Sequence, residues 1–123
     1  MRIGVDITSI SQMEHSLQVS ETLAATVFTA SERSVAARAS AHRAAEFLAG
    51  RFAAKEAVVK ALRLGIEDPQ MMQEVEVRTA DDGSPMLSLY GRVRQAALDC
   101  GLSEWQVSIS HEAGSAMAVV LLS

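Results

Sequence analysis

Apolar and polar residues alternate, or gather into short apolar runs, in five separate stretches of the chain. Period-two alternation places successive side chains on opposite faces of an extended backbone, so these stretches are predicted to be β-strands. They are Ile3–Ile7, Glu74–Thr79, Met86–Tyr90, Trp105–Ser110 and Ser115–Leu122. In the first strand we expect Ile3, Val5 and Ile7 to form the buried face, which turns Asp6 to the opposite side.

Between the strands, apolar residues recur at spacings of three and four, which predicts helices. Four are expected, over residues 11–27, 29–39, 40–63 and 91–99, the first from a weak pattern. Thr29 and Glu32 form a capping-box sequence at the start of the second helix. Ser40 is placed to cap the third helix, and Gly65 suits the position after its C-cap. The turn residues of Asp81–Pro85 should join two strands into a hairpin.

The order of these elements is strand, helices, two strands, helix, two strands. It predicts an α+β fold, in which a small and mostly antiparallel sheet packs against one long helix and several shorter ones. At 123 residues the chain is expected to form a single domain over 1–123. Because 49% of the residues are hydrophobic but only 4% are aromatic, the core must consist mainly of Ala, Val, Leu, Ile and Met. Such a core is thin for its length, and association of several copies would add buried surface.

The charge and the targeting features exclude several classes of protein. A net charge of −4 argues against general nucleic-acid binding, which needs a basic surface. The longest apolar run, Ala116–Leu122, is too short to cross a bilayer, and the N-terminal residues lack the apolar core of a signal peptide. Cys100 is the only cysteine, so neither a disulfide framework nor a cysteine zinc site is expected. We therefore expect a cytoplasmic protein that binds neither nucleic acid nor membranes.

A carboxylate interrupts the apolar face of the long helix. Six positions share that face, and five of them hold residues that suit burial: Ala45, Leu48, Ala49, Phe52 and Val59. The sixth is Glu56, whose charge is costly to bury unless a cation or proton donors meet it. Lys60, one turn later, could form an ordinary ion pair with Glu56, and a bound metal ion is the other explanation. The pattern alone leaves both explanations open.

Asp6 and His111 are two further polar residues with two possible roles each. Asp6 is either a solvent-exposed strand residue or a ligand of a hard cation. Asp6 and Glu56 come from different elements with no His or Cys beside them, and such a pair suits Mg²⁺ better than zinc. Mg²⁺ commonly binds one or two protein carboxylates and then the phosphates of a substrate. His111 follows Ser108–Ser110 at a strand end, where it is either a turn residue or a contact for a phosphate or base.

The chain has no P-loop, GxSxG, HExxH or CxxC sequence. Its distinctive motifs are Ile3-Gly4-Val5-Asp6-Ile7, Phe28-Thr29-x-x-Glu32, Leu48–Ala57 with Lys60-Ala61, Glu76-Val77 with Gly83-x-Pro85, and Val107–His111 followed by Ala116 and Ala118. In these segments, which span nearly the whole chain, the protein resembles the holo-acyl-carrier-protein synthases, the small bacterial 4′-phosphopantetheinyl transferases. The helix segment is the most specific of these matches.

The resemblance implies a chemistry, a fold and an assembly. Members of this family transfer the 4′-phosphopantetheine arm of coenzyme A to a serine of an apo acyl carrier protein, an acidic partner, and adenosine 3′,5′-bisphosphate leaves. The resemblance implies the 4′-phosphopantetheinyl transferase fold. It also implies a homotrimer with its active sites at the subunit interfaces, which agrees with the thin core.

The resemblance also implies site residues. Asp6 and Glu56 match the Mg²⁺ ligands of the family, and Lys60 matches a basic residue that contacts the phosphates. Glu56, or a metal-bound water, is then the candidate base for the serine proton. The other expected contacts of coenzyme A are Lys55, Gly65, Gly83, Pro85, Ser110 and His111.

Two segments depart from the family pattern. Gln12 stands where the family usually has an Arg associated with the acidic carrier, and Arg63-Leu64 replaces the first two residues of a Gly-Thr-Gly loop. Docking of the carrier would then need other basic residues, such as Arg33, Arg38, Arg43 or Arg51. Two alternatives to the enzyme stay open. One is a catalytically weak paralogue that binds coenzyme A or carrier protein as a scaffold or regulator, and the other is an unrelated α+β module in which Glu56 and Lys60 form only an ion pair.

Overall fold

Strands and helices follow one another in the predicted α+β order in the computed structural model, which describes residues 1–123. The elements are β1 Arg2–Ser9, α1 Ile10–Val19, α2 Leu23–Val27, α3 Ala30–Ala36, α4 Ala41–Leu62, the 3₁₀ helix η1 Pro69–Glu74, β2 Val75–Thr79, β3 Pro85–Leu89, α5 Gly91–Asp99, β4 Trp105–Glu112 and β5 Ser115–Leu122. None of the helices combines the length and the apolar composition needed to cross a bilayer.

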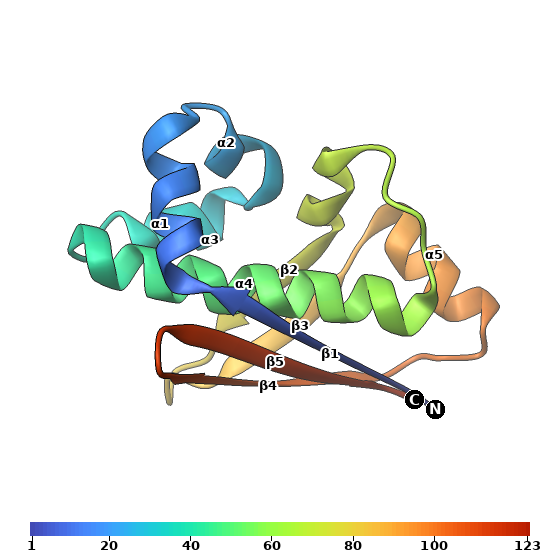
Figure 1. Cartoon of the computed structure of the whole chain (residues 1–123). Helices are drawn as coiled ribbons and strands as arrows, with labels where there is room; N and C mark the ends of the chain where they lie inside the picture. Colours follow the sequence, from blue (N-terminus) through green and yellow to red (C-terminus); the bar gives the residue numbers. More distant parts are fainter.

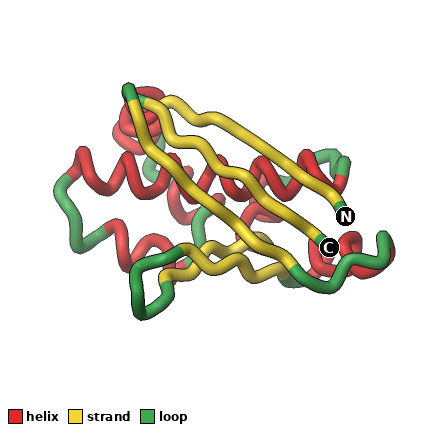
Figure 2. Tube along the Cα trace, turned by 90° about the horizontal axis from the view of Figure 1, so that it is seen from below, coloured by secondary structure: helices red, strands yellow, loops and turns green.

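One three-stranded antiparallel sheet forms the floor of the molecule. Its strand order is β1-β5-β4, with Asp6 opposite Ala118 and Ala118 opposite Ile109. β2 and β3 form a separate antiparallel hairpin that packs next to β4. α4 crosses one face of the sheet, and α1, α2 and α3 lie on the far side of α4 (Figure 1). The view from below in Figure 2 shows that no helix covers the other face of the sheet.

The small side chains of α4 allow it to pack closely against its neighbours on both sides. The Ser40 hydroxyl caps its N-terminus by accepting a hydrogen bond from Arg43 N–H at 3.4 Å. Six of its alanines are buried and present nothing larger than a methyl group: Ala45, Ala49, Ala53, Ala54, Ala57 and Ala61. The main core therefore lies between α4, the sheet and the β2–β3 hairpin, and a second cluster joins α4 to α1, α2 and α3.

The long helix ends at Leu62, within one residue of the predicted end near Arg63, but the left-handed residue that ends it is Arg63 and not Gly65. Arg63 adopts the left-handed backbone conformation with φ of 55°, and Leu64 N–H donates a hydrogen bond to the carbonyl of Val59 at 3.0 Å. A left-handed conformation costs a non-glycine residue roughly 1 kcal/mol or more, which is why the pattern favoured Gly65. Gly65 lies beyond the cap in an exposed loop.

The weak helical pattern over residues 11–27 corresponds to two helices, α1 and α2, rather than one. Ser20 ends α1 with an extended backbone, and its hydroxyl accepts a hydrogen bond from Leu23 N–H at 3.2 Å, where α2 begins.

The predicted capping box at the start of α3 is confirmed. Thr29 and Glu32 exchange both of its hydrogen bonds.

The apolar face of β1 is exposed in the chain, contrary to the sequence prediction. Ile3, Val5 and Ile7 have exposed fractions of 65%, 49% and 64%. Gly4 is buried on the opposite face, where a Cβ would overlap the carbonyl oxygen of Ala57 on α4. Because only glycine permits such a close approach of strand and helix, the face that meets α4 is the one with the smaller residues. Period-two alternation identified the strand but could not show which face the helix covers.

Gly4→Ala is expected to destabilise the protein by about 3 kcal/mol, the upper end of the usual cost of overpacking. The added methyl group meets backbone rather than a mobile side chain, so the strand and α4 must separate. Equilibrium unfolding in urea measures the loss. Gly65→Ala is the matched control, because nothing lies within 4 Å of a Cβ at that position. Equal unfolding midpoints for the two variants would contradict the close approach.

Candidate active site

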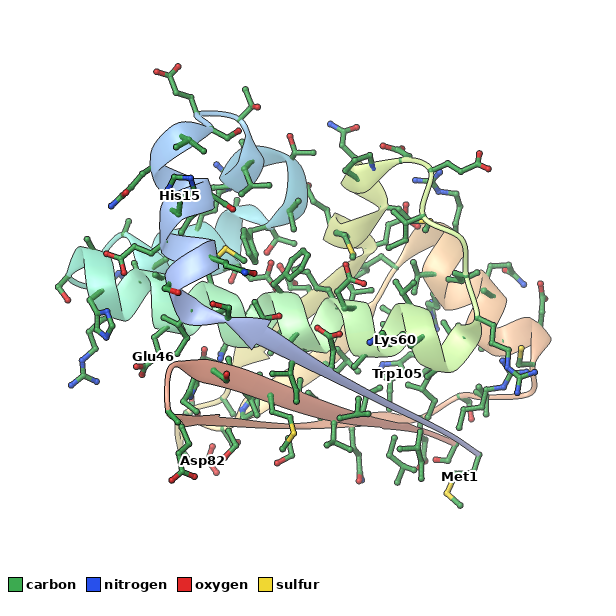
Figure 3. All side chains as sticks on the ribbon, in the orientation of Figure 1. Met1, His15, Glu46, Lys60, Asp82 and Trp105 are labelled. Carbon is green, nitrogen blue, oxygen red and sulfur yellow. The ribbon has the colours of Figure 1, made fainter.

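β1 and α4 bring three charged side chains together. Lys60 Nζ lies 2.8 Å from Asp6 Oδ1 and donates a hydrogen bond to it. Thr8 Oγ1 donates a longer hydrogen bond, of 3.3 Å, to the other oxygen of Asp6. Glu56 lies one helical turn before Lys60 and is half-buried. Figure 3 shows Lys60 on the part of α4 that β1 crosses.

The pKa values of this group show that its carboxylates repel one another. The pKa of Glu56 is raised, mainly by burial and further by the negative charge of Asp6, while the positive charge of Lys60 opposes the shift. The pKa of Lys60 is raised, mainly by its hydrogen bond to Asp6. The group therefore contains two carboxylates and one ammonium. Its excess of negative charge favours the binding of a further cation.

Of the two explanations that the sequence left open for Glu56, the ion pair with Lys60 is not formed, because Lys60 pairs with Asp6 instead. The structure contains no group of three or more His, Cys, Asp or Glu side chains that could hold a metal ion by themselves. Asp6 and Glu56 thus offer two hard oxygen ligands from two elements. This donor set fits Mg²⁺, which needs only one or two protein carboxylates when the phosphates of a substrate supply other ligands.

Lys55 is fully buried, which corrects the prediction that it contacts coenzyme A. Its Nζ lies 2.8 Å from Glu32 Oε1 and donates to the carbonyl oxygens of Met72 and Val75. The other carboxylate oxygen of Glu32 accepts a hydrogen bond from Val77 N–H at 2.8 Å. All three ammonium protons of Lys55 have partners and its exposed fraction is 0%, so it stabilises the fold and does not reach a ligand.

A second group of polar side chains lines a pocket of about 260 Å³ beside the N-terminal half of α4. Arg43, Phe47 and His111 contribute a guanidinium, an aromatic ring and an imidazole to its wall. His111 Nε2 lies 3.2 Å from the carbonyl oxygen of Glu46. Figure 3 shows Glu46 toward the opposite end of α4 from Lys60. Sequence reasoning singled out His111 but missed Phe47, because an aromatic residue in an apolar helix is usually part of the core.

Arg51 stacks on Phe47 and has one buried nitrogen without a hydrogen-bond partner. Its guanidinium carbon lies 4.0 Å from the centroid of the Phe47 ring, and its Nη2 donates to Thr79 Oγ1 at 3.1 Å. Its Nε is buried and makes no hydrogen bond. Burial lowers the pKa of Arg51, and the charge of Glu32 opposes that shift. Its charge, stacked on a ring that lines the pocket, adds a positive potential that favours an anionic ligand there. The spacing of four between Phe47 and Arg51 is the sequence signal that could have revealed this pair.

The remaining predicted contacts lie apart from Asp6 within one chain. Ser110 is opposite Met117 in the sheet and exposed on its open face. Gly83 occupies the turn of the β2–β3 hairpin with φ of 87°, and Pro85 begins β3. β1 forms one edge of the sheet, whereas the hairpin lies beyond β4 at the other edge (Figure 2). A single chain therefore does not bring all predicted site residues into one site.

A third pocket, of about 200 Å³, adjoins the charged group and is lined mainly by apolar residues. Thr8, which donates to Asp6, and Phe52, one turn before Glu56, both contribute to it. Its rim includes Gln12 of α1. No single motif predicts this pocket, because its wall is assembled from β1, α1, α2 and α4.

The family model of the 4′-phosphopantetheinyl transferase superfamily matches residues 2–119 of the chain. A holo-[acyl-carrier-protein] synthase from Moorella thermoacetica is 41% identical over 122 residues, which cover 99% of this chain and 93% of that protein. The holo-[acyl-carrier-protein] synthase from Pseudoalteromonas atlantica is 39% identical over 122 residues, which cover 99% and 95% of the two chains.

Solved structures share the fold along nearly the whole chain. The holo-(acyl-carrier-protein) synthase of Bacillus anthracis in complex with CoA (3′,5′-ADP) has a TM-score of 0.78 and 34% identity, over 98% of this chain and 94% of that chain. The ACPS–CoA complex of Chronobacterium ammoniagenes has a TM-score of 0.83 and 32% identity, over 98% and 95%. Both matches include β1 and α4, because they extend over almost all of this chain.

Proposed function

Because the chain belongs to the 4′-phosphopantetheinyl transferase superfamily, we propose that the group of Asp6, Glu56 and Lys60 is its catalytic centre. The enzyme transfers the 4′-phosphopantetheine arm of coenzyme A to a serine of an apo acyl carrier protein and releases adenosine 3′,5′-bisphosphate, as expected of a relative of the holo-acyl-carrier-protein synthases. One observation supports the centre above all others. β1 and α4 bring two carboxylates and an ammonium together, so that a diphosphate could contact the ammonium and a metal ion held by the carboxylates.

The proposed reaction exchanges one phosphorus–oxygen bond for another. The serine Oγ forms a bond to the phosphorus next to the pantetheine arm, and the bond from that phosphorus to the bridging oxygen of the diphosphate breaks. Glu56 is our candidate acceptor for the serine proton, because it is a half-buried carboxylate of the group that would face the diphosphate. Lys60 places positive charge where negative charge collects on the leaving oxygen.

We propose Mg²⁺ as the cofactor and Asp6 and Glu56 as its protein ligands. When bound, the ion neutralises the diphosphate and stabilises the charge that develops on the leaving oxygen. The excess negative charge of the two carboxylates over the single ammonium supports a cation at this place. The oxygen ligands and the absence of His and Cys support Mg²⁺ over zinc.

We propose that the nucleotide end of coenzyme A binds in the pocket of about 260 Å³ beside α4. Arg43 and His111 supply polar contacts for phosphate there and Phe47 offers an aromatic surface, while Glu46 adds one carboxylate to the same lining. Arg51 stacks on Phe47 and adds positive charge next to the pocket. Four further residues remain proposed contacts of coenzyme A: Gly65, Gly83, Pro85 and Ser110.

We propose that the active enzyme is a homotrimer with its sites between subunits. The open face of the sheet exposes five large apolar side chains, which association would bury: Ile3, Val5, Ile7, Met117 and Val119. The Asp6 edge and the hairpin edge lie apart in one chain. A head-to-tail contact would place one edge beside the other edge of the next copy, and such contacts can close into rings. Each site would then draw residues from two copies.

Val5→Glu is expected to convert the trimer into monomers and to lower transfer activity at least tenfold. The buried charge would cost more than about 1.4 kcal/mol at the subunit contact, which is a tenfold change in association. Size-exclusion chromatography with light scattering measures the mass. Val19→Glu is the matched control, because Val19 is 68% exposed at the end of α1, away from the sheet. A trimeric Val5→Glu variant would overturn the proposed interface.

We propose that the carrier protein docks over the pocket of about 200 Å³, next to Asp6, so that its serine reaches the diphosphate. Gln12 in its lining brings no positive charge, so we propose that attraction to an acidic carrier comes from Arg33, Arg38, Arg43 or Arg51. The single free Cys100 suits a reducing compartment, and we propose the cytoplasm as the place of reaction.

Incubation with coenzyme A, Mg²⁺ and apo acyl carrier protein tests the proposed function. Mass spectrometry of the carrier is expected to show the gain of one phosphopantetheine arm, and EDTA is expected to abolish it. A folded enzyme that fails with a panel of carrier proteins would support the catalytically weak paralogue instead. Transfer that persists in EDTA would overturn the metal site but not the transferase.

A further inference from the structure

Both carboxylate oxygens of Asp6 already have a proton donor in the structure. Lys60 Nζ is 2.8 Å from Oδ1, and Thr8 Oγ1 is 3.3 Å from Oδ2. A metal ion that uses Asp6 as a ligand must therefore displace one of these donors or share an oxygen with it. The stronger of the two contacts is the ion pair with Lys60, because it is shorter and charge-assisted.

An ammonium and a divalent cation on the same carboxylate repel one another. Mg²⁺ binds oxygen at about 2.0–2.1 Å, so an ion on Asp6 would lie within a few ångströms of the Lys60 ammonium. The side chain of Lys60 is free to leave, because it is 58% exposed and approaches a side chain of Asp6 that is 15% exposed. Because the ammonium of this pair is exposed, water can replace Asp6 as its partner, and the pair opens readily.

A neighbouring lysine shows what a fixed ammonium looks like in this fold. Lys55, five residues earlier on α4, is held by Glu32 and two carbonyl groups and has no exposed surface. Lys60 has a single acceptor, Asp6, and the rest of its ammonium faces solvent. Two of its protons thus remain available to a second anion without any rearrangement of the helix.

We propose that Lys60 is an exchangeable cation, which holds Asp6 until the diphosphate of the donor draws it away, and that this exchange couples metal binding to donor binding. The inference rests on the proposed function of the site. A donor diphosphate gives Lys60 a new partner and releases Asp6 for the ion. By linkage, a bound ion then favours the donor by the same factor.

Mn²⁺ binding, measured by electron paramagnetic resonance of the free ion, tests the exchange. Wild type and Lys60→Met are compared without donor and with saturating coenzyme A, after correction for Mn²⁺ bound by coenzyme A alone. Without donor, Lys60→Met is expected to bind Mn²⁺ roughly fivefold or more tightly than wild type, the lower end of typical couplings. The enhancement of Mn²⁺ affinity by coenzyme A is expected to be smaller in the variant by at least the same factor.

Arg63→Gln is the matched control, because it removes one positive charge from the end of the same helix without touching Asp6. It is expected to change Mn²⁺ affinity without donor by less than twofold, since an exposed charge at a distance is screened. Lys60→Gln repeats the test with a different neutral side chain. If Arg63→Gln and Lys60→Met changed the Mn²⁺ affinity equally, the loss of any positive charge would explain the result, and the exchange would be overturned.

Failure of the exchange and failure of the proposed function give different results. If wild type binds Mn²⁺ in the presence of coenzyme A, but Lys60→Met binds it no more tightly without donor, only the exchange is wrong. If wild type binds no Mn²⁺ even with coenzyme A, the metal site itself is wrong and the exchange falls with it. Mass spectrometry of the carrier protein reports transfer independently of both measurements.

Discussion

Asp6→Ala is expected to lower the rate of arm transfer by about 10²–10³-fold, the usual effect of removing one fixed electrostatic group from an active site. The substitution deletes one of the two proposed metal ligands and leaves Lys60 without its partner. The initial rate of formation of the loaded carrier, followed by mass spectrometry at saturating coenzyme A and Mg²⁺, measures the effect. The folded structure should persist, because a neighbouring position on β5 already holds Ala118.

Asp99→Ala is the control for this loss of activity. Asp99 is exposed at the end of α5, and its side chain accepts a hydrogen bond from Gln95, so its removal eliminates the same charge on an element outside the proposed centre. Its rate should stay within about twofold of wild type, since screening weakens the influence of a distant surface charge. If Asp6→Ala transfers the arm as fast as Asp99→Ala does, Asp6 is not part of the catalytic centre.

Lys55→Met is expected to destabilise the protein by about 3–5 kcal/mol, because it leaves the carboxylate of Glu32 buried without its cation. The side chain of Glu32 is 1% exposed, and Lys55 also satisfies the carbonyls of Met72 and Val75. Those groups belong to the segment that leads into β2, so the loss extends beyond α4. Equilibrium unfolding in urea measures the loss, at one fixed protein concentration because association of copies would shift the midpoint.

Lys60→Met makes the same chemical change five residues further along the same helix. It should alter stability much less than Lys55→Met does, since the Lys60 ammonium is exposed to solvent, whereas Lys55 and Glu32 are both fully buried. The two variants should also separate in activity: Lys60→Met is expected to lose transfer while it remains folded. Similar stabilities for Lys55→Met and Lys60→Met would contradict the assignment of Lys55 to the fold.

The few aromatic residues of the chain are concentrated around α4, and the core that they help to form leaves one face of the sheet uncovered. Three of the five aromatic residues serve the packing or the pockets around α4: Phe28, Phe47 and Phe52. The apolar residues of β1 and β5 that a larger core would cover remain on the open face of the sheet. The proposed trimer would bury that face and complete the active sites by the same contact.

Much of the fold could be predicted from local sequence. The hairpin, the capping box of Thr29 and Glu32, and the cap at Ser40 were predicted correctly, because each depends on residues a few positions apart. The left-handed residue after α4 was not, since Arg63 adopts the conformation that the pattern assigned to Gly65. The weak pattern before residue 27 gave no sign of the break at Ser20.

The sequence by itself determined which residues carry charge and in which elements they lie, and its motifs pointed to Asp6, Glu56 and Lys60 before any contact was known. Only the tertiary structure decided that Lys60 binds Asp6, that Lys55 is buried, and that Gly4 rather than Ile3 faces α4. Asp6 and Lys60 are 54 residues apart, and the close approach at Gly4 depends on the backbone of another element. Such contacts follow from how a strand and a helix pack together, which the periodicity of either element alone does not encode.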